Sequence, residues 1–212
     1  MQLTERHVIE CNDPRYKTID AAAFASKNVY NATTYIVRQV FFLEGEYLNY
    51  NTMDRIMQKH EAYRVLPTKV AQMVVKQVHE AWESYFEACK EYREHPEKFT
   101  GRPRLPKDKT SGRNLLQYNM QAVSRGKRTR DRGIIKPSQL GITVKTRQDP
   151  KAINEVRIAP KKGYYVVEIV YTKEEKQGEL NKEYIAGIDM GVDNLLALTA
   201  NKPAFQAVVV NG

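Results

Sequence analysis

Cysteine is scarce in this chain, and long hydrophobic runs are absent. The 212 residues include 2 cysteines, Cys11 and Cys89, too few for a disulfide framework or a cysteine-rich zinc site. No apolar run approaches the roughly 20 residues that a membrane-spanning helix needs. The first residues, MQLTERHVIEC, lack the basic and then apolar pattern of a signal peptide. We therefore expect a cytoplasmic protein without a membrane partner.

Acidic residues are scarce in one segment. From Lys98 to Lys162, 18 Lys or Arg stand against 4 Asp or Glu, a net charge of +14, whereas the whole chain carries +9. The excess positive charge therefore belongs to this segment, as in proteins that bind a polyanion with a dedicated surface. Because cations that neutralise phosphates release condensed counterions, a nucleic-acid backbone is the expected partner. A solvated charged loop is the alternative.

The first half of the sequence is mostly helical in pattern. A short strand is predicted at residues 3–11, followed by helices over 16–46, 52–63 and 66–96. Thr68 is a candidate cap for the last of these helices. Trp82 lies at helical spacing, which favours a core position over a base-stacking one. An apolar stripe is predicted on the first helix, formed by Val29, Ala32, Ile36, Val40 and Leu43.

The second half changes to a period of two. A basic segment covers 97–114, and its proline and glycine residues predict a loop rather than a helix there. Strands are then predicted, separated by turn residues, and a polar linker covers 172–183. Two short strands around Asp189 and a third at 204–210 complete the pattern. The strands of the middle part are expected at residues 115–123, 140–146, 155–160 and 164–172.

A carboxylate interrupts an apolar run close to the end of the chain. In IAGIDMGVDNLLAL, residues 185–198, Asp189 follows a strand-forming stretch and stands between Gly187 and Gly191. Such an Asp can be a turn residue that bonds its own backbone, or a hard oxygen ligand for Mg²⁺. A two-metal phosphodiesterase needs further carboxylates beside it. A similar Asp opens the phosphate loop of actin-type ATPases, but the turn here has no Ser or Thr.

Several stretches in order resemble one protein family. GIDMGVDNLLAL resembles the first RuvC motif of the TnpB proteins, the transposon-encoded ancestors of the miniature type V CRISPR nucleases. SKNVYNATTYIVRQ (26–39) is similar to the first long helix of that family. The blocks at 66–109, 112–124 and 156–171 follow in the expected order, so the resemblance covers nearly the whole chain.

The resemblance implies an α+β fold. It implies a wedge-type β-barrel with an inserted helical recognition domain, followed by the first strands of an RNase H-like (RuvC) domain. The expected boundaries are 1–13 for the first barrel strand, 14–98 for the helical domain, 99–173 for the rest of the barrel, 174–182 for a linker and 183–212 for the truncated start of RuvC.

The resemblance also implies a function. The chain is expected to be the N-terminal portion of an RNA-guided DNA endonuclease of a prokaryotic cytoplasm, associated with the nucleoid. Its partners would be a guide RNA from the transposon end, double-stranded target DNA and a C-terminal RuvC half. Asp189 would be the first catalytic metal ligand for Mg²⁺, while the other carboxylates and a four-cysteine Zn²⁺ element would lie beyond these residues. This chain by itself is expected to be catalytically incomplete, and a nuclease-inactive RNA-guided DNA-binding protein is the alternative.

Specific side chains follow from this hypothesis. The start of the helix at Thr68, Lys69 and Gln72 is a candidate for recognising a short flanking motif, because a helix N-terminus offers free N–H groups to phosphate. An ordinary exposed helix end is the alternative. Tyr118 is either a base-stacking ring or a buried strand tyrosine. The cations expected to contact the nucleic-acid backbone are Lys98, Arg102, Arg104, Lys107, Lys109 and Arg113.

Overall fold

The computed structural model forms two compact units. It describes residues 1–110, 112–124, 133–175, 178, 181–191 and 194–211. The first unit is Met1–Lys173 and the second is Glu174–Gly212. The segment 125–132, which holds five of the cations in the basic stretch, lies outside the described residues.

A four-stranded antiparallel sheet is the base of the first unit. Its strands are β1 (Gln2–Glu10), β7 (Tyr164–Thr172), β6 (Ile153–Pro160) and β2 (Leu116–Asn119), in the order β1-β7-β6-β2. All of β1 pairs with β7, from Gln2 opposite Thr172 to Glu10 opposite Tyr164. The sheet therefore brings the start of the chain against a strand that follows the whole helical segment.

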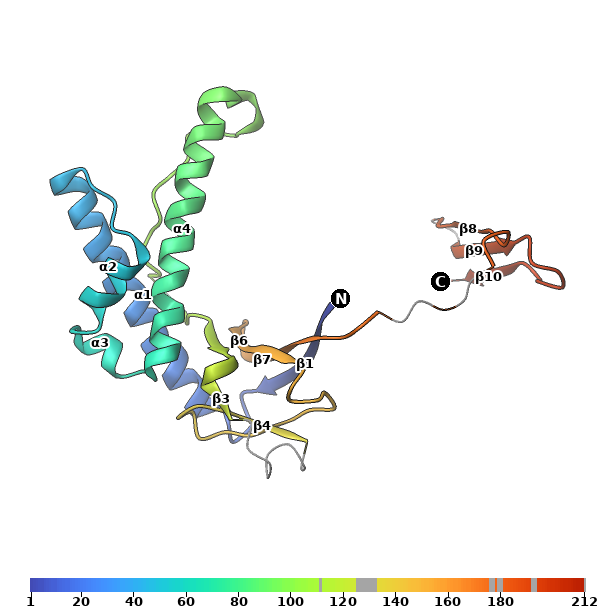
Figure 1. Cartoon of the computed structure of the whole chain (residues 1–212), viewed down its shortest axis with the longest axis horizontal. Coiled ribbons are helices and arrows are strands. Elements are labelled where there is room, and N and C mark those ends of the chain that lie inside the picture. The colour runs from blue at the N-terminus through green and yellow to red at the C-terminus, as the bar shows by residue number, and fades with distance from the viewer. Residues whose placement is uncertain (111, 125–132, 176–177, 179–180, 192–193, 212) are drawn as a thin grey trace. The chain divides into compact units, whose positions relative to one another are not determined.

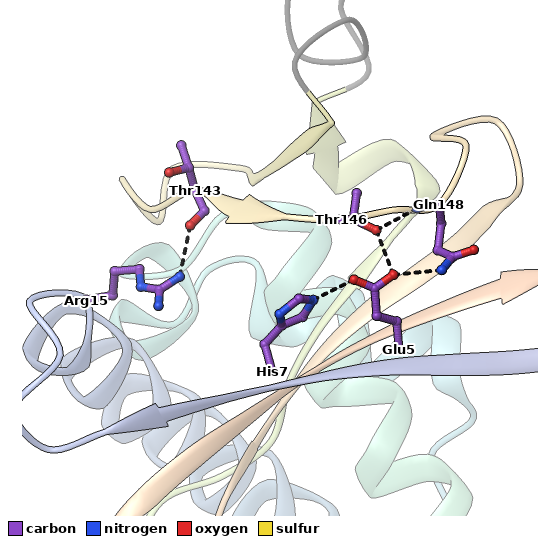
Figure 2. A network of polar contacts seen from close by, with 6 residues as sticks. All are labelled: Glu5, His7, Arg15, Thr143, Thr146 and Gln148. Carbon is purple, nitrogen blue, oxygen red and sulfur yellow. Dashed lines mark hydrogen bonds and ion pairs between the residues drawn. The ribbon is translucent and has the colours of Figure 1, made fainter.

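A smaller sheet lies beside the open edge of β1. It contains β3 (Val123–Ser124), β4 (Ile134–Pro137) and β5 (Val144–Lys145). Side chains join the two sheets there (Figure 2): Glu5 accepts hydrogen bonds from Thr146 Oγ1 at 3.1 Å and Gln148 Nε2 at 2.8 Å. The described strands of the first unit thus form two sheets, and the wedge-type barrel stays a prediction.

The helical segment lies between β1 and β2 in the chain. The first unit therefore combines helices and sheets, as predicted from the sequence. Figure 1 shows α1 and α4 extending away from the sheets, with the short helices beside them. None of the described helices combines the length and hydrophobicity that a membrane crossing requires. The helices are α1 (Tyr16–Glu44), α2 (Tyr50–Met57), α3 (Glu61–Arg64) and α4 (Thr68–Glu94), with 3-10 turns η1 (Pro96–Lys98) and η2 (Met120–Ala122).

The buried face of α1 differs in part from the predicted apolar stripe. Leu43 is 79% exposed, whereas Ser26 and Thr33 are fully buried. Thr33 Oγ1 donates to the Val29 carbonyl at 2.8 Å, and this bond removes the cost of burying the hydroxyl. Val29 is fully buried, and Ala32 and Ile36 pack against the core, so the predicted stripe is partly right. Hydropathy alone missed the small hydroxyl residues that fit the packed interface. The buried residues are Ile19, Ala23, Ser26, Val29, Tyr30, Thr33, Thr34 and Val37.

The helix α4 matches its predicted position, but its start differs in detail. Pro67 is the N-cap and Thr68 is the first helical residue, without a side-chain capping bond. The Thr68 cap was therefore a wrong prediction. Trp82 is fully buried and packs edge-on against Phe41 at 5.1 Å between ring centroids, which confirms the core assignment. Cys89 is half-buried.

The second unit is a small antiparallel sheet. Its strands are β8 (Ala186–Asp189), β9 (Asn194–Ala200) and β10 (Val208–Asn211), in the order β10-β9-β8. None of its described residues is buried, and Ile188 and Met190 are 65% and 81% exposed. Three strands need a covered apolar face for independent stability. The described part of this unit therefore has no core of its own, and an RNase H-like domain stays a prediction.

We predict that acid destabilises the turn between β1 and α1 through Asp13, whose carboxylate is bonded to Arg15. Hydrogen bonds from the Arg15 guanidinium hold the pKa of Asp13 at about 2, below its ordinary 3.8. A folded pKa below the unfolded one stabilises the fold above pH 3.8, and that contribution is lost as the pH falls towards 2. Asp13→Asn should therefore be less stable than the parent protein at neutral pH and equal to it near pH 2, measured by urea unfolding. Asp108→Asn, at an exposed carboxylate, is the control, and a constant difference across pH would contradict the assignment.

Candidate nucleic-acid interface

The basic loop is fastened to α1 by a pair of backbone contacts. Asn31 Nδ2 donates to the Lys109 carbonyl at 3.0 Å, and the Lys109 N–H donates to Asn31 Oδ1 at 2.9 Å. One side chain therefore satisfies both backbone groups of a loop residue, as a neighbouring strand would. The loop lies against the helix in a fixed register.

The Lys109 side chain points into the protein. Its ammonium donates to Asn114 Oδ1 and lies 4.6 Å from the centroid of the Tyr30 ring. Burial lowers the pKa of Lys109. Asn114 is itself fully buried and donates to Ser26 Oγ at 3.0 Å and to Gln77 Oε1 at 3.1 Å. Lys109 thus anchors the loop between α1 and α4 rather than presenting its charge to a ligand.

Arg113 is a second anchor. Its Nε and Nη2 donate to the two carboxylate oxygens of Asp20 at 2.9 and 2.8 Å. Tyr165 on β7 donates to the same carboxylate at 2.7 Å. The Arg113 bonds hold the pKa of Asp20 below its ordinary value despite burial, while burial and the Asp20 charge raise the pKa of Tyr165. Loop, helix and sheet meet at this one carboxylate.

Three of the predicted cations remain free. Arg102, Arg104 and Lys107 are exposed, and their side chains form no ion pair or hydrogen bond with the residues that the structure describes. Lys98 is also exposed, but its Nζ forms an ion pair with Glu91 Oε1 at 2.6 Å. A phosphate can pair with these three cations without breaking an existing bond. Arg102, Arg104 and Lys107 are therefore the better candidates for contacts with a nucleic-acid backbone.

Tyr118 is a buried strand tyrosine. It is 1% exposed on β2, and burial raises its pKa. A ring in this position presents no face to a nucleobase, so the structure corrects the stacking assignment. The alternation of strand residues places Tyr118 on the inward face of β2 together with Leu116, while Gln117 and Asn119 are half-buried.

The start of α4 exposes the three residues predicted for flanking-motif recognition to different degrees. Thr68 and Lys69 are exposed, and Gln72 is half-buried. The backbone N–H groups of Thr68 and Lys69 have no partner within the helix, as at any helix start. No acidic residue lies in this first turn. The site therefore keeps the partial positive charge of a helix N-terminus.

A buried carboxylate lies behind Gln72. Asp54 on α2 accepts hydrogen bonds from Tyr63 Oη at 2.8 Å, Gln58 Nε2 at 2.7 Å and Gln72 Nε2 at 3.4 Å. A carboxylate only accepts, so the amide nitrogen of Gln72 must face Asp54. The carbonyl oxygen and the second N–H of Gln72 are left for a ligand.

Asp189 lies at the end of β8, opposite Ala197 on β9. Its carboxylate is exposed and accepts no hydrogen bond from the described residues, so nothing in them supports the turn-residue alternative. It borders a hollow of about 330 Å³ whose other lining is mostly apolar. Within the described ranges no three His, Cys, Asp or Glu side chains could hold a metal ion. One carboxylate does not fit a two-metal centre by itself.

Two of the solved structures that are similar to this chain are complexes of Cas12f proteins. No family model matches the sequence, and no curated protein matches it. One of these structures is a Cas12f1–sgRNA–target DNA complex, with a TM-score of 0.38 and 11% sequence identity. The match covers 99% of this chain and 57% of the Cas12f1 chain. The other is a CRISPR-Cas12f ternary complex, with a TM-score of 0.42 and 9% sequence identity. The match covers 92% of this chain and 47% of the Cas12f chain. The chain thus spans about half the length of these proteins, and such similarity assigns no family.

The anchor role of Arg113 predicts a stability effect that the free cations do not share. Arg113→Met should lower the free energy of unfolding by about 1–2 kcal/mol, because it removes two charge-assisted hydrogen bonds to Asp20. Arg102→Met, on the same loop, should change it by less than about 0.5 kcal/mol. Urea unfolding of both variants measures this. Equal effects would contradict the division between anchors and free cations.

Proposed function

We propose that this chain is the N-terminal portion of an RNA-guided DNA endonuclease, which binds guide RNA and target DNA. The ordered sequence blocks that resemble TnpB support this choice of function. In such proteins base pairing recognises sequence, while the protein contacts the shape and backbone of the RNA–DNA hybrid. The basic loop provides the backbone contacts in this proposal.

The division of the basic loop into anchored and free cations carries the proposal. Asn31, Lys109 and Arg113 fix the loop on α1. Arg102 and Arg104 are then held at the surface on a fixed backbone with their charges available. A loop that is ordered before binding loses less conformational entropy on complex formation. A charged loop that serves only solubility needs no such fastening.

The start of α4 is proposed as the contact with the flanking motif. Lys69 is suited to a phosphate, because it is an exposed point charge on a flexible stem. Gln72 offers one acceptor and one donor once Asp54 holds its other N–H. In the major groove adenine presents the complementary pair, the N6 donor and the N7 acceptor. We therefore assign an adenine in the flanking motif to Gln72.

Asp189 is proposed as one ligand of a metal site whose other ligands are not among the described residues. Its exposed position at the end of a strand suits this role. An RNA-guided binding protein without cleavage would not need this carboxylate, so Asp189 favours the nuclease over the inactive alternative.

Charge reversal tests the proposal directly. Arg102→Glu with Arg104→Glu should weaken binding to structured RNA by at least about tenfold at low salt. The slope of log affinity against log salt should fall by roughly 0.7–0.9 for each lost phosphate contact. Binding isotherms across a salt series measure both quantities.

The matched control changes net charge equally elsewhere. Lys17→Glu with Lys90→Glu alters two exposed lysines on α1 and α4 outside the basic loop. The control should retain most of the RNA affinity. If both double variants lose the same affinity, net charge rather than the loop is responsible, and the proposal fails.

Base preference tests the start of α4. With duplexes that vary the flanking positions, Gln72→Ala should relax the preference for adenine at one position, where a good base contact is worth roughly 1–3 kcal/mol. Lys69→Ala should weaken binding to all duplexes alike, because phosphate contacts carry no sequence information. Competition binding measures both. A uniform loss for Gln72→Ala would remove its assignment.

A further inference from the structure

A hollow of about 380 Å³ lies between the basic loop and the C-terminal half of α4. Tyr85 and Ala88 of α4 line it together with Tyr30 of α1, and the loop contributes Phe99, Arg104 and Pro106. None of the described residues that line the hollow is acidic. It is therefore an apolar and aromatic site with a cation at its wall.

The aromatic rings of the hollow are held by their neighbours. Phe99 packs edge-on against Tyr92 with 5.6 Å between ring centroids. Tyr85 packs against Phe86 at 5.4 Å. Tyr30 is 8% exposed and has Lys109 4.6 Å from its ring centroid. Rings fixed in this way lose little freedom when a planar ligand stacks on them.

The free cations lie on the same short loop as Phe99, next to the aromatic rings that α1 and α4 contribute. Arg104 lines the hollow, while Arg102 and Lys107 flank it in the sequence and are exposed without ion pairs among the described residues. Aromatic rings next to unpaired cations are the arrangement that binds an unpaired nucleotide, in which the base stacks and the phosphate meets a cation. A base inside a duplex is stacked between its neighbours and cannot enter such a hollow.

We propose that this hollow binds an unpaired nucleotide, with its base against Tyr85 and Phe99 and its phosphodiester beside Arg104. The inference rests on the proposed nucleic-acid function and names the structure of the bound strand. RNA and DNA strands share the required chemistry, a flat base next to a phosphate. The acid-free lining and the free cations favour this ligand over an apolar peptide.

Single-stranded oligonucleotides test the inference with the 212-residue chain. RNA and DNA probes of one sequence carry 2-aminopurine, and each is measured both as a single strand and as a duplex. Tyr85→Ala should reduce affinity for the single strands by roughly 5- to 100-fold and abolish quenching of the probe, because one stacked base is lost. Duplex affinity should change by less than about twofold. The natural strand is the one, RNA or DNA, whose single-stranded probe loses more affinity in the Tyr85→Ala variant.

A second variant protects the test against misfolding. Ala88→Leu places a larger side chain in the hollow, so that it fills part of the space, and it leaves the aromatic residues in place. It should therefore produce the same selective loss. Tyr35→Ala, at an exposed α1 tyrosine that does not line the hollow, is the matched control and should bind like the parent protein.

The outcomes separate this inference from the proposed function. If charge reversal at Arg102 and Arg104 weakens binding but Ala88→Leu retains full single-strand affinity and quenching, the hollow is not the site. Equal loss on single strands and duplexes would also overturn it. If charge reversal itself changes nothing, the proposed function fails first.

Discussion

The carboxylate of Asp20 is the point on which the candidate interface depends. It accepts two hydrogen bonds from Arg113 and one from Tyr165, so that it joins the end of the basic loop, the first helix and the sheet. Paired ionic hydrogen bonds fix direction as well as distance. With Asn31 and Lys109 as the preceding attachment, the chain between η1 and β2 has a defined path over the helices.

This path separates two roles that the sequence presents as one. Lys109 and Arg113 contribute to the net charge of the basic segment, but their charges are already engaged inside the fold. Arg102, Arg104 and Lys107 retain theirs. The structural cations are partly buried, where pairing and hydrogen bonding offset the loss of hydration. The exposed cations keep their water until a phosphate replaces it.

The helix α4 links the two proposed contacts with nucleic acid. Its 27 residues make a rod of about 40 Å. Gln72 near its start and Tyr85 beside the hollow are separated by roughly 20 Å along the axis. A single packed helix therefore sets the spacing between the flanking-motif contact and the proposed unpaired nucleotide. The buried Trp82 packs against Phe41 of α1, and Gln72 donates to Asp54 of α2, so both contacts hold this helix against its neighbours.

The sequence by itself determined the two long helices, most of the strands and the location of the positive charge, because hydrophobic period and residue type are local properties. The single helix predicted over 52–63 is two short helices, α2 and α3. The sequence identified α4 nearly to its ends and placed Trp82 in the core. It missed part of the buried face of α1, where Ser26 and Thr33 pack inside through bonds to carbonyl groups. It also left Tyr118 undecided and did not single out Phe99.

The tertiary structure decided which charges are available and which aromatic rings line the hollow beneath the basic loop. Arg113 and Arg102 are equivalent cations in the sequence, and they differ only because Asp20, 93 positions before Arg113, lies within hydrogen-bonding distance of one of them. Pairing over that separation depends on how α1 packs against the loop and the sheet. No local pattern records this packing, so the distinction between an anchor and a free cation belongs to the fold.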